Sequence, residues 1–118
     1  MKNKAFLHRL GFASSGFILA LKAENSFRFQ VFAATIVILF LLVVQPSLIW
    51  SALLVVMIVM VLMAELFNTA IELLCDYVQP DHHKVIGKIK DLSAAAVLMS
   101  SIGSVVVAVL LVLDWLNK

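Results

Sequence analysis

Four polar side chains recur at helical spacing inside a strongly apolar segment of this chain. Glu65, Asn68 and Glu72 lie within residues 48–74, and Asp76 follows shortly after that stretch. Because a helix turns about 100° and rises about 1.5 Å per residue, the four share one narrow face that extends over about 16 Å. Oxygen ligands on one face suit a hard divalent cation such as Mg²⁺, and a carboxylate there could also act as a general base.

The alternative interpretation of this acidic face is a polar seam that joins helices within a membrane. That interpretation accounts well for Asn68, since amide side chains often hydrogen-bond between membrane helices. It accounts poorly for Glu65 and Glu72, because an ionisable side chain at bilayer depth costs roughly 2.5–3.5 kcal/mol or more. Unpaired buried carboxylates are also expensive. The pattern therefore favours a catalytic or ion-binding site.

The composition is that of a small integral membrane protein. The chain has 118 residues, of which 64% are hydrophobic, whereas soluble domains have about 45–50% apolar residues. One domain is the most that this length accommodates. A single copy has little room to enclose a site for two substrates, so we expect an oligomer. The net charge of only +2 gives no reason to expect a nucleic-acid partner.

The elements that must position the acidic face are all expected to be helices. Apolar and basic residues recur at helical spacing in residues 1–27, which is typical of an amphipathic helix lying in the membrane interface. Apolar runs predict transmembrane helices at residues 29–44, 48–75 and 92–113. Gln45-Pro46-Ser47 predicts a tight turn, and a polar loop at residues 79–84 separates the last two spans. The fold class is thus an all-α membrane protein.

Basic residues are distributed so unevenly that they predict a topology. Five of them precede the first span, and three lysines lie between the second and third spans, whereas the turn at residues 45–47 carries no charge. The positive-inside rule therefore places the N-terminus and the second loop in the cytoplasm. Glu24, Glu72 and Lys90 then converge on the side of the membrane where nucleotides are available.

Common nucleotide-binding loops are not present in the sequence. Gly11, Gly16, Gly87 and Gly103 fit neither the phosphate-binding loop nor the dinucleotide fingerprint. A bound nucleotide would therefore have to be held by side chains and a metal ion. The pair at residues 82–83 could ligate a transition metal, but without a nearby third ligand a solvated loop is the better interpretation.

Three motifs are distributed along the chain. The first is ELFNTAIE at residues 65–72, followed by Asp76. The second is KDLSAAAVL at residues 90–98. The third lies in the N-terminal helix and comprises Gly11, Phe12, Gly16, Ala20, Glu24, Phe27 and Arg28. These motifs, of which the first is highly specific, resemble those of the bacterial integral-membrane lipid kinases, a family that includes diacylglycerol kinases and undecaprenol kinases, and the likeness extends over nearly the whole chain.

The resemblance implies a homotrimer in the bacterial inner membrane, with active sites shared between subunits. It implies that Glu65 is the catalytic base, and that Glu24 and Glu72 hold Mg²⁺ on the phosphates of ATP. Residues implied to bind nucleotide or substrate are Phe12, Glu24, Asn68, Asp76, Asp81, His83, Lys90 and Asp91. Phe12 stands where some members have tyrosine, so a hydroxyl contact there is lost.

The function expected from this resemblance is ATP- and Mg²⁺-dependent phosphorylation of a membrane lipid alcohol, with diacylglycerol converted to phosphatidic acid. Undecaprenol is the alternative substrate, and Gln30 favours diacylglycerol because some undecaprenol kinases have histidine at that position. Two alternative functions are a small membrane scaffold and a conduit for protons or cations, since rows of acidic residues also form proton relays in membranes. Glu24 and the Lys90-Asp91 pair favour the kinase, because a conduit needs no phosphate site.

Overall fold

A computed structural model describes residues 2–118, with side chains from residue 5 onward, so residue 1 of the expected surface helix lies outside it. Within this range the chain forms four helices: α1 (Lys2–Ala23), α2 (Asn25–Val44), α3 (Leu48–Val78) and α4 (Lys84–Leu116). Helices α2, α3 and α4 are each long and apolar enough to cross a membrane. The expected all-α class and the three apolar spans are therefore confirmed.

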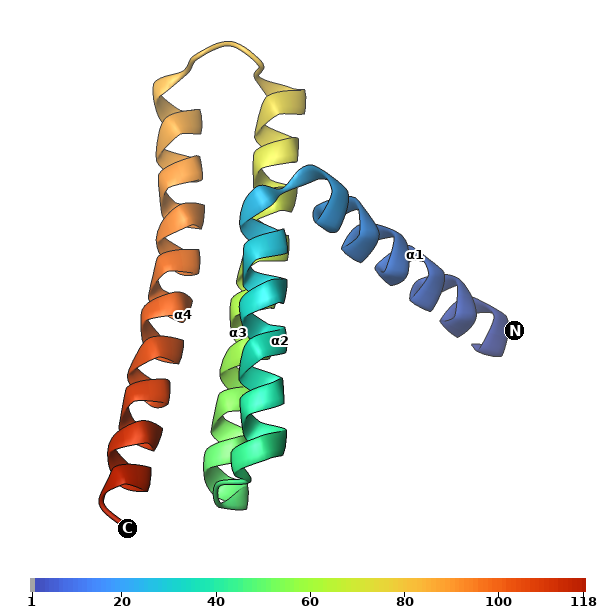
Figure 1. The fold of residues 1–118 in the computed structure, drawn as a ribbon. Coiled ribbons are helices and arrows are strands. Elements are labelled where there is room, and N and C mark those ends of the chain that lie inside the picture. The colour runs from blue at the N-terminus through green and yellow to red at the C-terminus, as the bar shows by residue number, and fades with distance from the viewer. Residues whose placement is uncertain (1) are drawn as a thin grey trace.

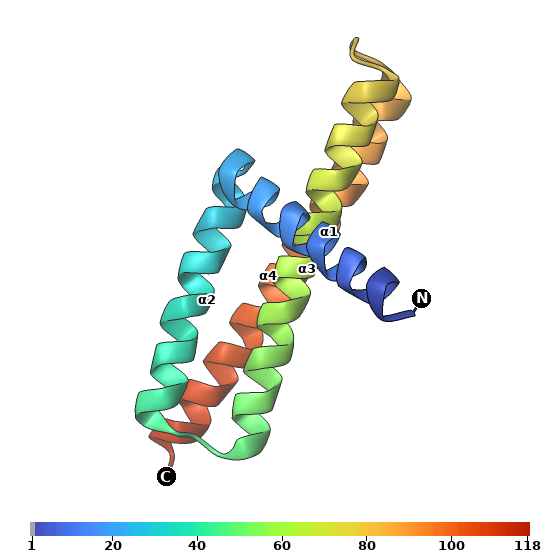
Figure 2. The same cartoon turned by 90° about the vertical axis from the view of Figure 1, so that its right-hand side faces the viewer.

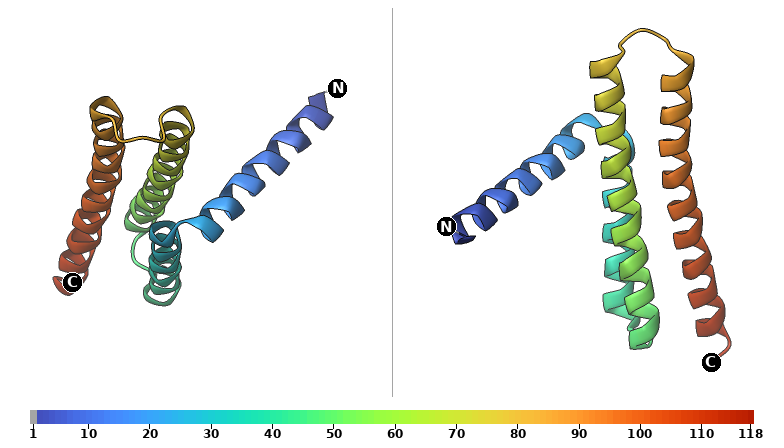
Figure 3. Two further views of the ribbon diagram at one scale, coloured as in Figure 1. Left: turned by 90° about the horizontal axis from the view of Figure 1, so that it is seen from above. Right: turned by 180° about the vertical axis from the view of Figure 1, so that it is seen from behind.

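Helix α3 is the central element of the arrangement. Helices α2 and α4 both run antiparallel to it, and the α3–α4 interface is the more extensive of the two (Figures 1 and 2). Helix α1 projects away from the other three and, among the residues described, contacts α2 and α3 but not α4 (Figure 3). The chain thus consists of a three-helix bundle to which α1 is attached through Glu24, and the bend at this residue is called the elbow below.

The helices of the bundle differ in length, and this difference positions the acidic face. Helix α2 has 20 residues and α3 has 31, so α3 is longer by about 16 Å at 1.5 Å per residue. The ends of α3 and α4 nearest their connecting loop consequently extend beyond the elbow between α1 and α2 (Figure 1). Glu65 therefore lies near the level of the elbow, and Asp76 lies beyond it.

The opposite end of the bundle carries its buried apolar cluster. Leu41 of α2, Leu54 of α3 and Leu111 of α4 pack together there. Nearby, the Trp50 indole Nε1 donates a hydrogen bond of 2.9 Å to Asp114 Oδ2 and so joins the start of α3 to the end of α4. Most other large apolar side chains are exposed, as surfaces that face lipid or another protein chain in a membrane must be.

The turn between α2 and α3 follows from the residues at 45–47. Gln45 adopts the left-handed conformation, with φ 50° and ψ 59°, and its N–H donates to the carbonyl of Leu41 at 3.0 Å. This geometry closes the C-terminus of a helix, and Pro46 then prevents the helix from continuing. The reversal is tight enough to bring α2 directly against α3.

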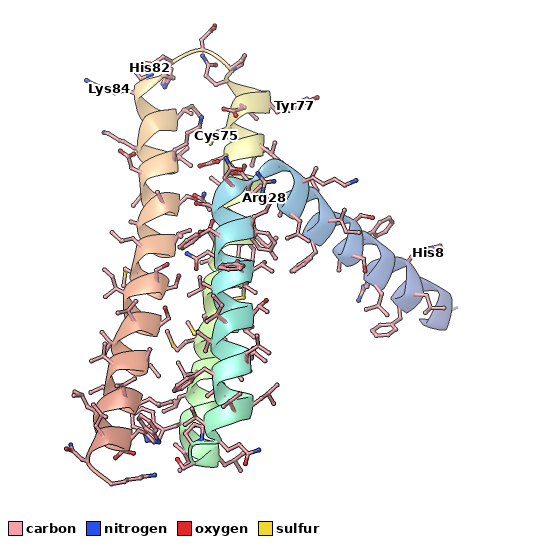
Figure 4. The ribbon with its side chains drawn as sticks, in the orientation of Figure 1. His8, Arg28, Cys75, Tyr77, His82 and Lys84 are labelled. Carbon is pink, nitrogen blue, oxygen red and sulfur yellow. The ribbon has the colours of Figure 1, made fainter. Side chains whose placement is uncertain are left out.

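The elbow between α1 and α2 is held by Arg28. Glu24 separates the two helices in an extended conformation, with φ −116° and ψ 114°. The Arg28 guanidinium donates to the carbonyls of Leu21 at 2.7 Å and Lys22 at 2.9 Å, which are among the last carbonyls of α1 and lack helical partners. Figure 4 shows Arg28 at this elbow.

An aromatic contact completes the elbow. Phe27 is fully buried, and its ring meets that of Phe17 edge-on with a centroid separation of 5.1 Å. The hydrogen bonds of Arg28 and the contact between Phe17 and Phe27 both join α1 to the start of α2, across Glu24. The backbone at Glu24 is therefore held by its neighbours rather than left in a loose loop.

Candidate active site

Glu65 occupies the buried centre of the acidic face. Only 4% of this residue is exposed, and the side chain of Gln30 from α2 lies close enough to interact with its carboxylate. Glu24 at the elbow and Glu72 on α3 both lie near enough to act electrostatically on Glu65. Glu65 thus lies within electrostatic range of one carboxylate at the elbow and of another on its own helix.

A second group of side chains links α3 to α4 beside these acids. The Asn68 amide Nδ2 donates to Glu72 Oε1 at 3.3 Å. The hydroxyl of Ser93 on α4 donates to Asn68 Oδ1. Glu72 is therefore connected through Asn68 to a residue of the neighbouring helix.

The loop end of the α3–α4 hairpin contains a polar pocket of about 260 Å³. Lys90 of α4 forms an ion pair with Asp76 of α3 on its wall, with Nζ 2.7 Å from Oδ1. The pocket is lined by Asp76, Gln79, Pro80, Asp81, His82, His83, Ile86, Gly87 and Lys90. It therefore contains four of the residues expected near a nucleotide: Asp76, Asp81, His83 and Lys90.

His83 has a structural role at this pocket as well. Its Nδ1 accepts a hydrogen bond of 3.1 Å from the backbone N–H of Val85, and so it caps the N-terminus of α4. With Nδ1 occupied in this way, the other ring nitrogen, Nε2, is the one left for a ligand.

Two expected site residues lie elsewhere in the single chain. Phe12 is 74% exposed on α1, where it lines a shallow pocket with Leu7, His8, Gly11 and Ser15. Asp91 lines a separate pocket with Lys88, Leu92 and Ala95. Consecutive residues of a helix point about 100° apart, so Asp91 cannot face α3 in the way that Lys90 does.

The carboxylates of the acidic face do not form a closed structural metal site in the part of the chain that the structure describes. Among the residues that the structure describes, no group of three or more His, Cys, Asp or Glu side chains is placed to hold a metal ion. Mg²⁺ bound to a nucleotide commonly uses only one or two protein carboxylates, together with phosphate oxygens and water. Glu24 and Glu72 would supply such a pair.

Sequence reasoning missed the roles of three residues at this site. Gln30 was considered only in relation to the lipid substrate, yet its side chain lies beside Glu65. Ser93 follows Lys90 by three residues, a spacing that puts both on the same side of a helix. Arg28 holds the elbow that carries Glu24, and no local pattern indicates its bonds to the carbonyls of α1.

Comparison with known proteins agrees with this arrangement. Residues 11–112 match the family described as prokaryotic diacylglycerol kinase. The chain belongs to this family. Diacylglycerol kinases of Escherichia coli strain K12, Escherichia coli O157:H7 and Shigella flexneri are each 28% identical to it over 96 residues, which are 81% of this chain and 79% of the relative.

Membership of the prokaryotic diacylglycerol kinase family decides between the functions considered for this chain. It confirms the kinase and disfavours the scaffold and the ion conduit. Together with the three apolar helices, it also establishes a multi-pass membrane protein.

Proposed function

We propose that this chain transfers the γ-phosphoryl group of Mg²⁺-bound ATP to the hydroxyl of diacylglycerol, which gives phosphatidic acid and ADP. The observation that carries the proposal is the burial of Glu65 at the elbow, with Glu24 and Glu72 nearby. A buried carboxylate within electrostatic range of two further carboxylates is costly, and phosphoryl transfer to an alcohol has a use for each of them. The names of the family and of the similar proteins support diacylglycerol as the substrate.

Glu65 is the proposed general base. Its carboxylate takes the proton of the lipid hydroxyl while the hydroxyl oxygen forms a bond to the γ-phosphorus and the bond from that phosphorus to the ADP oxygen breaks. Glu65 lies about 10 Å along the helix axis from Glu72, at 1.5 Å per residue. The base thus lies on the membrane side of the proposed metal ligands, where the hydroxyl of a lipid can reach it.

Glu24 and Glu72 are the proposed metal ligands, and Lys90 is the proposed phosphate contact. Phosphoryl transfer depends chiefly on positioning and on neutralising charge. Glu24 and Glu72 would hold Mg²⁺, which would neutralise charge on the phosphates. The pocket at the α3–α4 loop, with Lys90 on its wall, would accept the nucleotide from the aqueous side.

We also propose that the active enzyme is a homotrimer of the inner membrane with a cytoplasmic N-terminus. In a single chain Phe12 and Asp91 line pockets separate from Glu65, and neighbouring copies in a trimer would supply such residues to a shared site. The large exposed apolar surface leaves room for such contacts. The basic residues near α1 and near the α3–α4 loop support the orientation.

The decisive experiment offers two lipid alcohols to the purified protein. Radiolabelled ATP and Mg²⁺ are supplied in mixed detergent micelles that contain diacylglycerol, undecaprenol or both, and Glu65→Gln serves as the matched control. We expect labelled phosphatidic acid from wild type, and a loss of at least about a hundredfold in Glu65→Gln with nucleotide binding retained. Preferred labelling of undecaprenol would overturn the substrate, and a variant with more than about a tenth of wild-type turnover would overturn the general base.

A further inference from the structure

Ser93 is a buried polar residue to which the proposed reaction assigns no role. Only 7% of it is exposed, and it lies on the side of α4 that faces α3. Its hydroxyl donates to Asn68 Oδ1, and Asn68 Nδ2 donates in turn to Glu72 Oε1 at 3.3 Å. A continuous line of hydrogen bonds therefore runs from α4 through Asn68 to Glu72.

The chemistry of the Ser93 hydroxyl, the Asn68 amide and the Glu72 carboxylate permits hydrogen-bond donation in only one direction, from Ser93 toward Glu72. An ionised carboxylate can only accept hydrogen bonds, so the NH₂ of the Asn68 amide must face Glu72. The amide oxygen then faces α4 and requires a donor, which the Ser93 hydroxyl supplies. If that donor were removed, one end of the Asn68 amide would no longer be held.

We propose that Ser93 is a positioning residue that fixes the Glu72 carboxylate for metal binding by holding the Asn68 amide. With Oε1 held by Asn68, the second carboxylate oxygen of Glu72 is left for Mg²⁺. Side chains that orient a metal ligand typically change metal affinity by about 10–100-fold when they are removed. This inference rests on the proposed function, in which Glu72 is a ligand of the metal.

Other serines of α4 show that this arrangement is not the default for a helical serine. Ser100 donates to the carbonyl of Val97 at 2.8 Å, and Ser104 donates to that of Ser101 at 2.7 Å. Both hydroxyls return to their own helix, as those of helical serines commonly do. Ser93 instead bonds to a side chain of α3, so Ser100 provides a matched control on the same helix.

The test compares Ser93→Ala with Ser100→Ala in the full-length protein. We expect Ser93→Ala to raise the Mg²⁺ concentration for half-maximal activity by about tenfold, with kcat at saturating Mg²⁺ close to wild type. Ser100→Ala should leave both quantities unchanged. Mn²⁺ binding in the presence of ADP, followed by electron paramagnetic resonance, should weaken by a similar factor in Ser93→Ala and gives a readout independent of turnover.

A double-mutant cycle tests whether Ser93 acts through Asn68. In an Asn68→Leu background, Ser93→Ala should change the Mg²⁺ requirement by less than about twofold, because coupled residues show non-additive effects. Independent effects that multiply would overturn the proposal. So would a Ser93→Ala variant that behaves like Ser100→Ala.

Two further variants cover the case in which Ser93→Ala lowers the thermal midpoint. Ser93→Thr keeps the hydroxyl and should keep the wild-type Mg²⁺ requirement, whereas Ser93→Cys fills a similar space with a weak donor and should raise it. Equal Mg²⁺ requirements in these two variants would contradict a role for the hydroxyl. A Glu72→Gln variant with an unchanged Mg²⁺ requirement would contradict the metal ligand itself, whatever Ser93 does.

Discussion

Lys90 of α4 holds Asp76 of α3 across the loop end of the hairpin, with Nζ 2.7 Å from Asp76 Oδ1. The side chains are 39% and 63% exposed, respectively, and ion pairs this accessible to water contribute little to stability. Their value lies in the position that they give to Lys90, whose ammonium group stays on the wall of the polar pocket. A nucleotide phosphate that enters the pocket would compete with Asp76 for that group.

The first prediction separates the two partners of this ion pair. Lys90→Met should raise the KM for ATP by about tenfold or more, because a charge-assisted contact to a phosphate is lost. Asp76→Asn should leave the thermal midpoint close to that of wild type, since the exposed pair adds little stability. Steady-state kinetics and thermal unfolding in detergent measure the two effects. An unchanged KM for ATP in Lys90→Met would place the nucleotide elsewhere.

The second prediction concerns the proposed metal ligands. Glu24→Gln and Glu72→Gln should each raise the Mg²⁺ concentration needed for half-maximal activity, and excess Mg²⁺ should restore part of the activity, because ligand charge sets the affinity for a hard cation. Titration of activity with Mg²⁺ at saturating ATP measures the change. Activity lost with an unaltered Mg²⁺ dependence would assign these carboxylates a structural role instead.

The third prediction concerns the close approach of α3 and α4. A Cβ added at Gly103 would lie 3.0 Å from Met57 Cε, the flexible end of a side chain. Gly103→Ala should therefore be tolerated, whereas Gly103→Leu should force the helices apart and lower the thermal midpoint. Met57→Ala should partly restore the midpoint of Gly103→Leu. Gly16→Leu is the control, because nothing lies within 4 Å of a Cβ built at Gly16.

The fourth prediction concerns topology. Ser47→Cys and Asp81→Cys, each in a Cys75→Ala background, can be labelled in intact cells with a membrane-impermeant thiol reagent. Labelling should occur at position 47 alone, because the one-sided distribution of basic residues places the Asp81 loop in the cytoplasm. Labelling at position 81 alone would separate the pocket from cellular ATP, and the proposed reaction could not then occur.

Much of the fold follows from the sequence because its signals are local. Pro46 predicts the turn between α2 and α3, and apolar runs of sufficient length predict the three transmembrane helices. The elbow at Glu24 has no comparable signal, since neither glycine nor proline is present there. Its cause is the contact of Arg28 with the carbonyls of α1, which depends on how two helices meet.

The candidate site shows the same division between local and non-local information. The spacing of Glu65, Asn68 and Glu72 places them on one face of α3. The partners that the structure gives to this face, Gln30 and Ser93, come from two other helices. Spacing within one helix cannot specify the rotation of its neighbours, so these partners could be found only from the packed structure.

The elbow divides the chain into a region that tolerates changes of length and a region that does not. Residues inserted early in α1 would lengthen a helix that projects away from the bundle, and the spacing from Leu21 to Arg28 would stay intact. A single residue inserted between these two positions would rotate the carbonyls of α1 by about 100° relative to the guanidinium. The match to the family, which begins only at residue 11, agrees with this division. Natural relatives should therefore vary in length before the elbow and keep a constant spacing across it.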